Sequence, residues 1–209
     1  MSGRFISFEG GEGSGKSTQA HRLAEALTLE GHDVVLTREP GGTEGAEAIR
    51  SLLVSGDPGR WTPWSEACLV NAARADHVER VVRPALARGA TVICDRFIDS
   101  TRAYQGAGKG LSDAVLLALH AEVTGNLWPD LTIILTLPPK KGLARAGNRA
   151  ESRSESRFEA HEAAFHARVQ AFFAGLAAAE PARCVAVSAD GSIEAVGARV
   201  RAAVCTAPC

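Results

Sequence analysis

The segment 10–17 holds the residues best suited to bind a phosphate group. Its sequence, GGEGSGKS, fits the pattern G-x-x-x-x-G-K-[ST]. Glycines let backbone N–H groups converge on an anion, and the helix expected after them directs its positive end to the same place. Lys16 would contact the β- and γ-phosphates, and Ser17 would bind Mg²⁺. The segment therefore predicts a nucleoside triphosphate site, and a flexible glycine turn is the less favoured alternative.

Charged residues also follow two other apolar runs. Arg38 follows the run 34–37, and Asp95 and Arg96 follow the run 91–94. Ligands of parallel sheets bind beyond the carboxyl ends of the strands, so we expect these side chains near the phosphate loop. Asp95 stands where phosphate-loop enzymes have the acid that orients Mg²⁺. Asp95 and Arg96 could equally form a structural salt bridge, but the second guanidinium, Arg38, favours a site for a second phosphate.

The pattern of the whole chain predicts an α/β fold. Apolar runs of strand length alternate with amphipathic helical stretches, as in a parallel sheet covered by helices on both faces. We expect a helical region at 65–87, kinked or broken near Pro84. An apolar stripe in the last third of the chain is best explained as core. The five expected strands are residues 5–8, 34–37, 91–94, 131–137 and 184–187, and the stripe consists of Phe165, Val169, Phe172, Phe173 and Leu176.

Length and composition narrow the class of protein. With 209 residues we expect a single domain over 1–209, with room for a lid. The 23 Lys and Arg nearly balance the 24 Asp and Glu, so nothing indicates a nucleic-acid partner. No apolar run approaches the ~20 residues of a membrane helix, and no signal region precedes the first strand. We expect a soluble cytoplasmic protein with no membrane partner.

Four strings together resemble the thymidylate kinase family: FEG at 8–10, TREPGGT at 37–43, AAR at 72–74 and DRFIDSTRAYQG at 95–106. The resemblance covers essentially the whole chain, and the second and fourth strings are far more specific than a phosphate loop. It implies a nucleoside monophosphate kinase fold with a five-stranded parallel sheet, a homodimer, and transfer of the γ-phosphoryl group of Mg·ATP to dTMP for dTTP synthesis. The implied ATP-binding residues are Gly10, Gly11, Glu12, Gly13, Ser14, Gly15, Lys16, Ser17 and Thr18.

The resemblance also implies how dTMP is held. Arg38 and Arg96 would clamp its phosphate, with Arg96 among the catalytic residues beside Lys16. Arg74 and Thr101 would bind the thymine ring.

The same resemblance assigns the sugar end and exposes one departure. Tyr104 would lie against C2′ and exclude a ribose hydroxyl, Glu12 would approach the 3′-hydroxyl, and Gln105 would help to shape the pocket. Val70 stands where the family usually has a phenylalanine that stacks on thymine. This departure leaves open the alternative of a kinase for dUMP or another pyrimidine deoxynucleotide.

A nucleotide switch protein is disfavoured, because such a protein has no use for a second phosphate pocket.

A charged segment at about 142–160 predicts a lid. Its arginines recur every four residues, and its glutamates form a second row offset by two residues. Every charged pair at i,i+4 therefore has two charges of the same sign. Each such pair destabilises a helix by about 0.2–0.5 kcal/mol. Such a segment is expected to order when an anion arrives. Thymidylate kinases keep a catalytic arginine either in the phosphate loop, where this chain has Gly13, or in the lid. The lid candidates are Arg149, Arg153 and Arg157, which the sequence does not rank.

Overall fold

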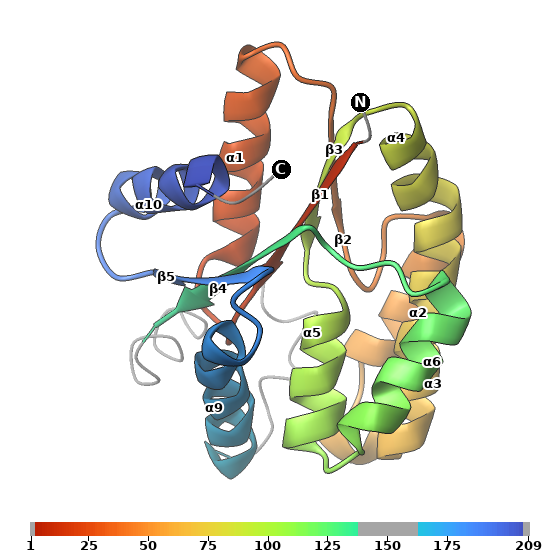
Figure 1. Ribbon diagram of the computed structural model, residues 1–209. Helices are drawn as coiled ribbons and strands as arrows, with labels where there is room; N and C mark the ends of the chain where they lie inside the picture. Colours follow the sequence, from red (N-terminus) through yellow and green to blue (C-terminus); the bar gives the residue numbers. More distant parts are fainter. Residues whose placement is uncertain (1–2, 138–162, 207–209) are drawn as a thin grey trace.

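The computed structural model describes residues 3–137 and 163–206 and contains a parallel five-stranded sheet with the strand order β2-β3-β1-β4-β5 (Figure 1). All four strand pairs are parallel. The predicted fold class is therefore confirmed, and the ends of each predicted strand agree with those of an observed strand to within one residue. The strands are β1 (Arg4–Glu9), β2 (Val34–Arg38), β3 (Thr91–Asp95), β4 (Leu131–Thr136) and β5 (Cys184–Ser188).

Alternate residues of the strands enter two different cores. Ile6 and Ile93 pack with α1 (Lys16–Leu29) and α10 (Ile193–Thr206) on one face of the sheet. Phe5 and Val92 pack on the opposite face. This alternation follows from the two-residue period of a strand, which sends neighbouring side chains to opposite faces. The central strand β1 is buried almost throughout because both faces are covered.

Helices cover both faces of the sheet (Figure 1). On one face lie α1 (Lys16–Leu29) and α10 (Ile193–Thr206), which contact each other. The helices on the opposite face include α9 (Ala163–Ala179). The predicted stripe lies on this helix and is core: four of its side chains are buried and Phe172 is half-buried. The remaining described helices are α2 (Glu44–Val54), η1 (Pro58–Arg60), α3 (Pro63–His77), η2 (Val78–Val82), α4 (Arg83–Ala87), α5 (Ile98–Thr101), η3 (Arg102–Gly108) and α6 (Asp113–Thr124).

A kink or break was expected near Pro84. The chain there stays helical but passes through a wider, π-helical turn. The π-helical segment η2 joins α3 to α4, and the Arg83 N–H bonds the Val78 carbonyl five residues earlier. Proline has no N–H and its ring crowds the carbonyl four residues before it, and a π turn accommodates both effects. A second π-helical segment, η3, carries Tyr104 and Gln105.

The expected lid, with Arg149, Arg153 and Arg157, lies outside the described residues. Within the described part of the chain, no helix is long and apolar enough to cross a membrane.

Candidate active site

The phosphate loop connects β1 to α1 and depends on its glycines. Gly10, Gly13 and Gly15 have φ angles of 134°, 70° and 89°, in the region that favours glycine. A Cβ on Gly10 would lie 2.4 Å from the Leu135 carbonyl oxygen. The loop therefore requires glycine for its backbone path, and α1 begins directly after it at Lys16 with its N-terminal N–H groups at the loop.

Lys16 is folded back onto this loop. Its Nζ donates to the carbonyl oxygens of Gly10 at 3.1 Å and Gly11 at 3.0 Å, and the residue is only 6% exposed. Burial and the nearby Arg96 charge lower the pKa of Lys16 from 10.5 to about 8, against the opposing effect of Glu12 and Asp95. Two neutral carbonyls are weak partners for an ammonium, so an incoming phosphate would be the stronger one.

Ser17 and Asp95 form the candidate magnesium site. The Ser17 Oγ donates to the Asp95 Oδ2 at 2.5 Å. The other carboxylate oxygen, Oδ1, is buried and has no hydrogen-bond partner among the described residues. A hydroxyl and a carboxylate are the hard oxygen groups that Mg²⁺ and its bound waters prefer. These residues therefore fit the predicted metal.

Arg96 pairs with the phosphate loop across a long sequence separation. Its Nη2 donates to Glu12 Oε1 at 2.7 Å, and the Tyr104 hydroxyl donates to the same oxygen at 2.6 Å. Arg96 has a φ of 72°, unusual for a non-glycine residue, and its guanidinium lies 5.1 Å from the centre of the Tyr104 ring. Burial opposes the charge of Glu12, but Arg96 and Lys16 more than offset it and lower the pKa from 4.5 to about 2. The cluster joins the phosphate loop to the predicted acceptor residues.

Glu9, at the end of β1, holds the turn that carries Arg96. Its carboxylate accepts hydrogen bonds from the Phe97 N–H at 2.8 Å, the Ser100 N–H at 3.2 Å and the Ser100 hydroxyl at 2.6 Å. Burial and then the Asp99 charge raise the pKa of Glu9 to about 7, partly countered by Ser100 and Arg96. Sequence reasoning did not assign Glu9 a role, although a glutamate ending an apolar strand was a visible signal.

Arg74 is held by three neighbours at the far end of the site. Its Nε donates to Glu39 Oε2 at 2.8 Å, Nη1 to Asn71 Oδ1 at 3.2 Å and Nη2 to Thr101 Oγ1 at 2.9 Å. Arg74 is 1% exposed. Arginine has five N–H donors, so two remain beyond these three bonds.

Glu39 also binds a buried histidine. Its Oε1 lies 2.9 Å from His77 Nδ1, and His77 Nε2 lies 2.7 Å from Thr37 Oγ1. Burial opposes the charge of Glu39, but Arg74 and His77 lower its pKa overall. Glu39 and His77 were missed from the sequence, although Glu39 belongs to the TREPGGT string.

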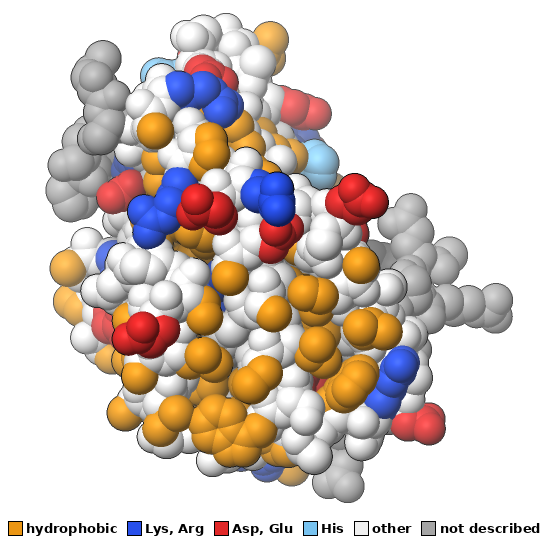
Figure 2. All heavy atoms as spheres, turned by 90° about the vertical axis from the view of Figure 1, so that its right-hand side faces the viewer, with side chains coloured by type: hydrophobic (Ala, Val, Ile, Leu, Met, Phe, Trp, Pro, Cys, Tyr) orange, Lys and Arg blue, Asp and Glu red, His pale blue; other side chains and the backbone are white. Residues whose placement is uncertain are grey.

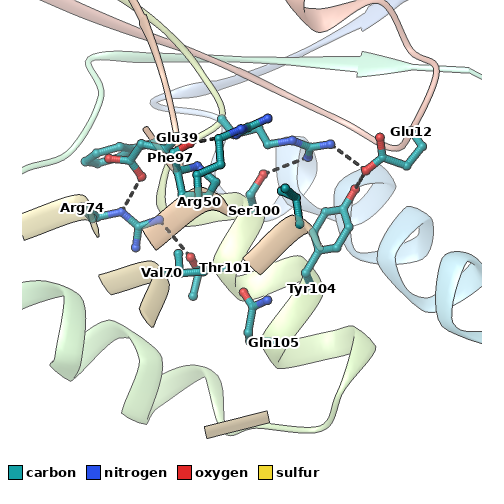
Figure 3. A pocket seen from close by; sticks show the side chains of 13 residues that line it. Glu12, Glu39, Arg50, Val70, Arg74, Phe97, Ser100, Thr101, Tyr104 and Gln105 are labelled. Carbon is teal, nitrogen blue, oxygen red and sulfur yellow. Dashed lines mark hydrogen bonds and ion pairs between the residues drawn. The ribbon is translucent and has the colours of Figure 1, made fainter. Parts of the chain in front are cut away.

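A pocket of about 660 Å³, counted with its open mouth, connects these groups (Figure 3). Seven residues predicted for the acceptor site line the pocket: Glu12, Val70, Arg74, Arg96, Thr101, Tyr104 and Gln105.

Arg38 is placed differently from the other predicted acceptor residues. Its Nη2 pairs with Glu47 Oε2 at 3.0 Å, and it lines a neighbouring hollow together with Ser17 and Asp95. In the main pocket, the cation on the wall near Pro40 is Arg50, which the sequence did not single out. Arg50 donates to the Pro40 carbonyl at 2.8 Å. A role for Arg38 in binding phosphate stays a prediction.

The fold and site define a phosphate-loop kinase of the nucleoside monophosphate class. The phosphate loop lies next to the pocket of Figure 3, which has Arg96 at one end and Arg74 at the other. Both lie beyond the carboxyl ends of adjacent parallel strands. The thymidylate kinase family model matches residues 8–200. The chain belongs to the thymidylate kinase family, and it is an ATP-dependent kinase.

Individual relatives agree with this assignment. A thymidylate kinase of Caulobacter vibrioides is 54% identical over 198 residues, which cover 95% of this chain and 94% of the relative. One of Cereibacter sphaeroides is 50% identical over 97% of this chain and 94% of its own length. The crystal structure of thymidylate kinase from Ehrlichia chaffeensis is similar with a TM-score of 0.78 and 34% identity, covering 99% of this chain and all of the other.

Proposed function

We propose that this protein transfers the γ-phosphoryl group of ATP to dTMP and so forms dTDP for dTTP synthesis. The observation that carries the proposal is the pocket of Figure 3, which runs from Glu12 in the phosphate loop to the buried guanidinium of Arg74. A monophosphate at the Arg96 end of this pocket would lie next to the triphosphate loop, while its base would lie at the Arg74 end. Membership of the thymidylate kinase family supports this acceptor.

The proposed chemistry needs no covalent intermediate. An oxygen of the acceptor phosphate is already a nucleophile, so catalysis consists of alignment and stabilisation of charge. Lys16 would leave the two loop carbonyls and donate to the triphosphate. Arg96 would hold the acceptor phosphate, and its ion pair with Glu12 fixes its position beforehand.

Ser17 and Asp95 would hold Mg²⁺, which supplies neutralisation of the charge on the transferred phosphoryl group. The bond between Ser17 and Asp95 orients both oxygens. Tyr104 would lie beside the sugar, and Arg74 and Thr101 beside the base.

We also propose that at least one lid arginine, Arg149, Arg153 or Arg157, completes the site. Arginines that neutralise the transferred phosphoryl group contribute about 10³–10⁵ in rate. Substitution of each by lysine keeps the charge but loses the planar fork. At least one variant should lose most of its kcat while KM for dTMP changes little, and normal kcat in all three would refute the lid role.

We propose that the protein forms a homodimer and acts in the cytoplasm. Figure 2 views the helices on the right of Figure 1, where hydrophobic side chains gather over a broad area of the surface. Leu52 of α2, Trp64 of α3 and Val115 of α6 are 42–47% exposed, and these helices pack side by side. Large exposed apolar side chains on adjoining elements favour an interface. Light scattering should give twice the chain mass, and Trp64→Glu should lower it.

A coupled assay that follows ADP tests the activity. With ATP and Mg²⁺, the acceptors dTMP, dUMP, UMP, CMP and AMP are compared at equal concentration. dTMP should give the highest kcat/KM. ADP formation that is indifferent to dTMP would indicate a nucleotide switch protein, and preference for another acceptor would refute the assignment.

A further inference from the structure

A buried ion pair stands behind the base end of the pocket. Glu66 of α3 is fully buried, and its Oε2 accepts a hydrogen bond from Lys109 Nζ at 2.9 Å. Its other oxygen, Oε1, accepts from Gln105 Nε2 at 2.7 Å. Gln105 lines the pocket with Thr101 and Val70, whereas Glu66 and Lys109 do not (Figure 3).

The ion pair decides which end of the Gln105 amide faces Glu66. An ionised carboxylate only accepts hydrogen bonds, and the ammonium of Lys109 stabilises the negative charge of the buried Glu66. The NH₂ end of Gln105 must therefore face Glu66. The amide's two ends are nearly the same size, so with a neutral partner either end could take this place. With Glu66 charged, the carbonyl oxygen is the end available to the pocket.

The pocket then offers a defined set of hydrogen-bonding groups to a base. Arg74 can only donate, and two of its N–H groups are not used by Glu39, Asn71 and Thr101. Gln105 offers an acceptor. Thymine and uracil carry a carbonyl oxygen at C4 beside an N3–H donor, which complements one donor and one acceptor. Cytosine carries the reverse, an amino donor at C4 beside an unprotonated N3 acceptor.

We propose that Glu66, supported by Lys109, is a positioning residue that keeps the carbonyl oxygen of Gln105 toward the base and so selects pyrimidines with an N3–H over cytosine. The inference rests on the proposed function, because it takes this pocket to hold the base of the acceptor. Glu66 acts through Gln105 and does not touch the acceptor.

The experiment measures kcat/KM for dTMP and for dCMP in the coupled assay. Glu66→Gln removes the charge and provides a side chain that can donate or accept, so that Gln105 can turn. The ratio of kcat/KM for dTMP to that for dCMP should fall at least tenfold, with kcat for dTMP within threefold of wild type. The control is Glu194→Gln, at a carboxylate 71% exposed on α10, which should leave the ratio unchanged.

The ratio separates positioning from a merely structural role. A general loss of packing lowers both acceptors together, so a Glu66→Gln ratio within twofold of wild type overturns the proposal. Lys109→Met is the second variant, because it removes the ammonium that pairs with Glu66 and leaves the Glu66–Gln105 contact without its charged partner. Lys109→Met should also lower the ratio of kcat/KM for dTMP to that for dCMP. If Glu66→Gln does not fold, a Lys109→Met ratio within twofold of wild type overturns the proposal.

One arm uses the unaltered enzyme and a modified acceptor. 3-Methyl-dTMP lacks the N3–H, and its kcat/KM should be at least a hundredfold below that of dTMP. Equal use of dTMP and 3-methyl-dTMP, or of dTMP and dCMP, by the wild type overturns the proposal. Absence of any dTMP phosphorylation by the wild type would instead overturn the proposed function itself, before any variant is compared.

Discussion

Raising the pH from 7 to 9 should weaken the binding of ATP, because Lys16 loses its proton in this range. The pKa of Lys16 is lowered to about 8 in the free protein, chiefly by burial. The triphosphate favours the charged ammonium, so its binding requires the proton that free Lys16 loses above pH 8. The sign is therefore fixed: affinity for ATP is full well below pH 8 and falls as the pH rises through 8.

The size of the effect follows from the same pKa. Lys16 is about 90% protonated at pH 7, half at pH 8 and about a tenth at pH 9, so the Kd for ATP should rise about tenfold between pH 7 and 9. The last ionisation of a phosphate group lies near pH 6, so the charge of ATP itself changes little in this window.

Calorimetric titration of ATP at pH 7, 8 and 9, without dTMP, measures this dependence directly. Buffers with different ionisation enthalpies would report the uptake of a proton on binding at pH 9. Lys16→Met is the control, because it should bind ATP weakly at pH 7 and show no further loss by pH 9. A wild-type Kd that changes less than twofold, or a Lys16→Met variant with the wild-type slope, would refute the reasoning.

Three further predictions concern the acceptor side and the core. Tyr104→Ala should raise kcat/KM for ribo-TMP relative to dTMP. Tyr104→Phe keeps the ring and removes the hydroxyl that donates to Glu12, so it should leave that ratio unchanged. Equal effects of the two substitutions would mean that another residue selects the sugar. Val70→Phe adds a surface for stacking that contributes about 1–3 kcal/mol and should lower KM for dTMP, and a raised KM would mean overpacking. Burial penalises the charged form of Glu9 and raises its pKa in the folded state. The folded state therefore loses stability as the pH rises from about 4.5 to 7. In urea unfolding, Glu9→Gln should therefore gain stability relative to wild type on going from pH 5 to pH 8, by about 2–3 kcal/mol, and an equal difference at both pH values would contradict this.

Much of the fold and the donor site could be predicted from the sequence because their signals are local. A buried parallel strand is visible as an apolar run of about five residues, and five such runs sufficed to predict the sheet. The glycines of the loop are required by backbone angles at their own positions. Ser17 and Asp95 could be expected near each other because the carboxyl ends of neighbouring parallel strands meet at one edge.

Only the tertiary structure decided which partner each charged side chain has. Arg96 could have paired with Asp95 beside it, but the fold gives it Glu12, 84 residues away. The sequence also does not reveal that Glu9, Glu39 and Glu66 are buried, since glutamate is mostly exposed in proteins. Burial and ion pairing depend on packing between elements far apart in the chain, so the residues that orient the predicted binding groups became visible only in the folded structure.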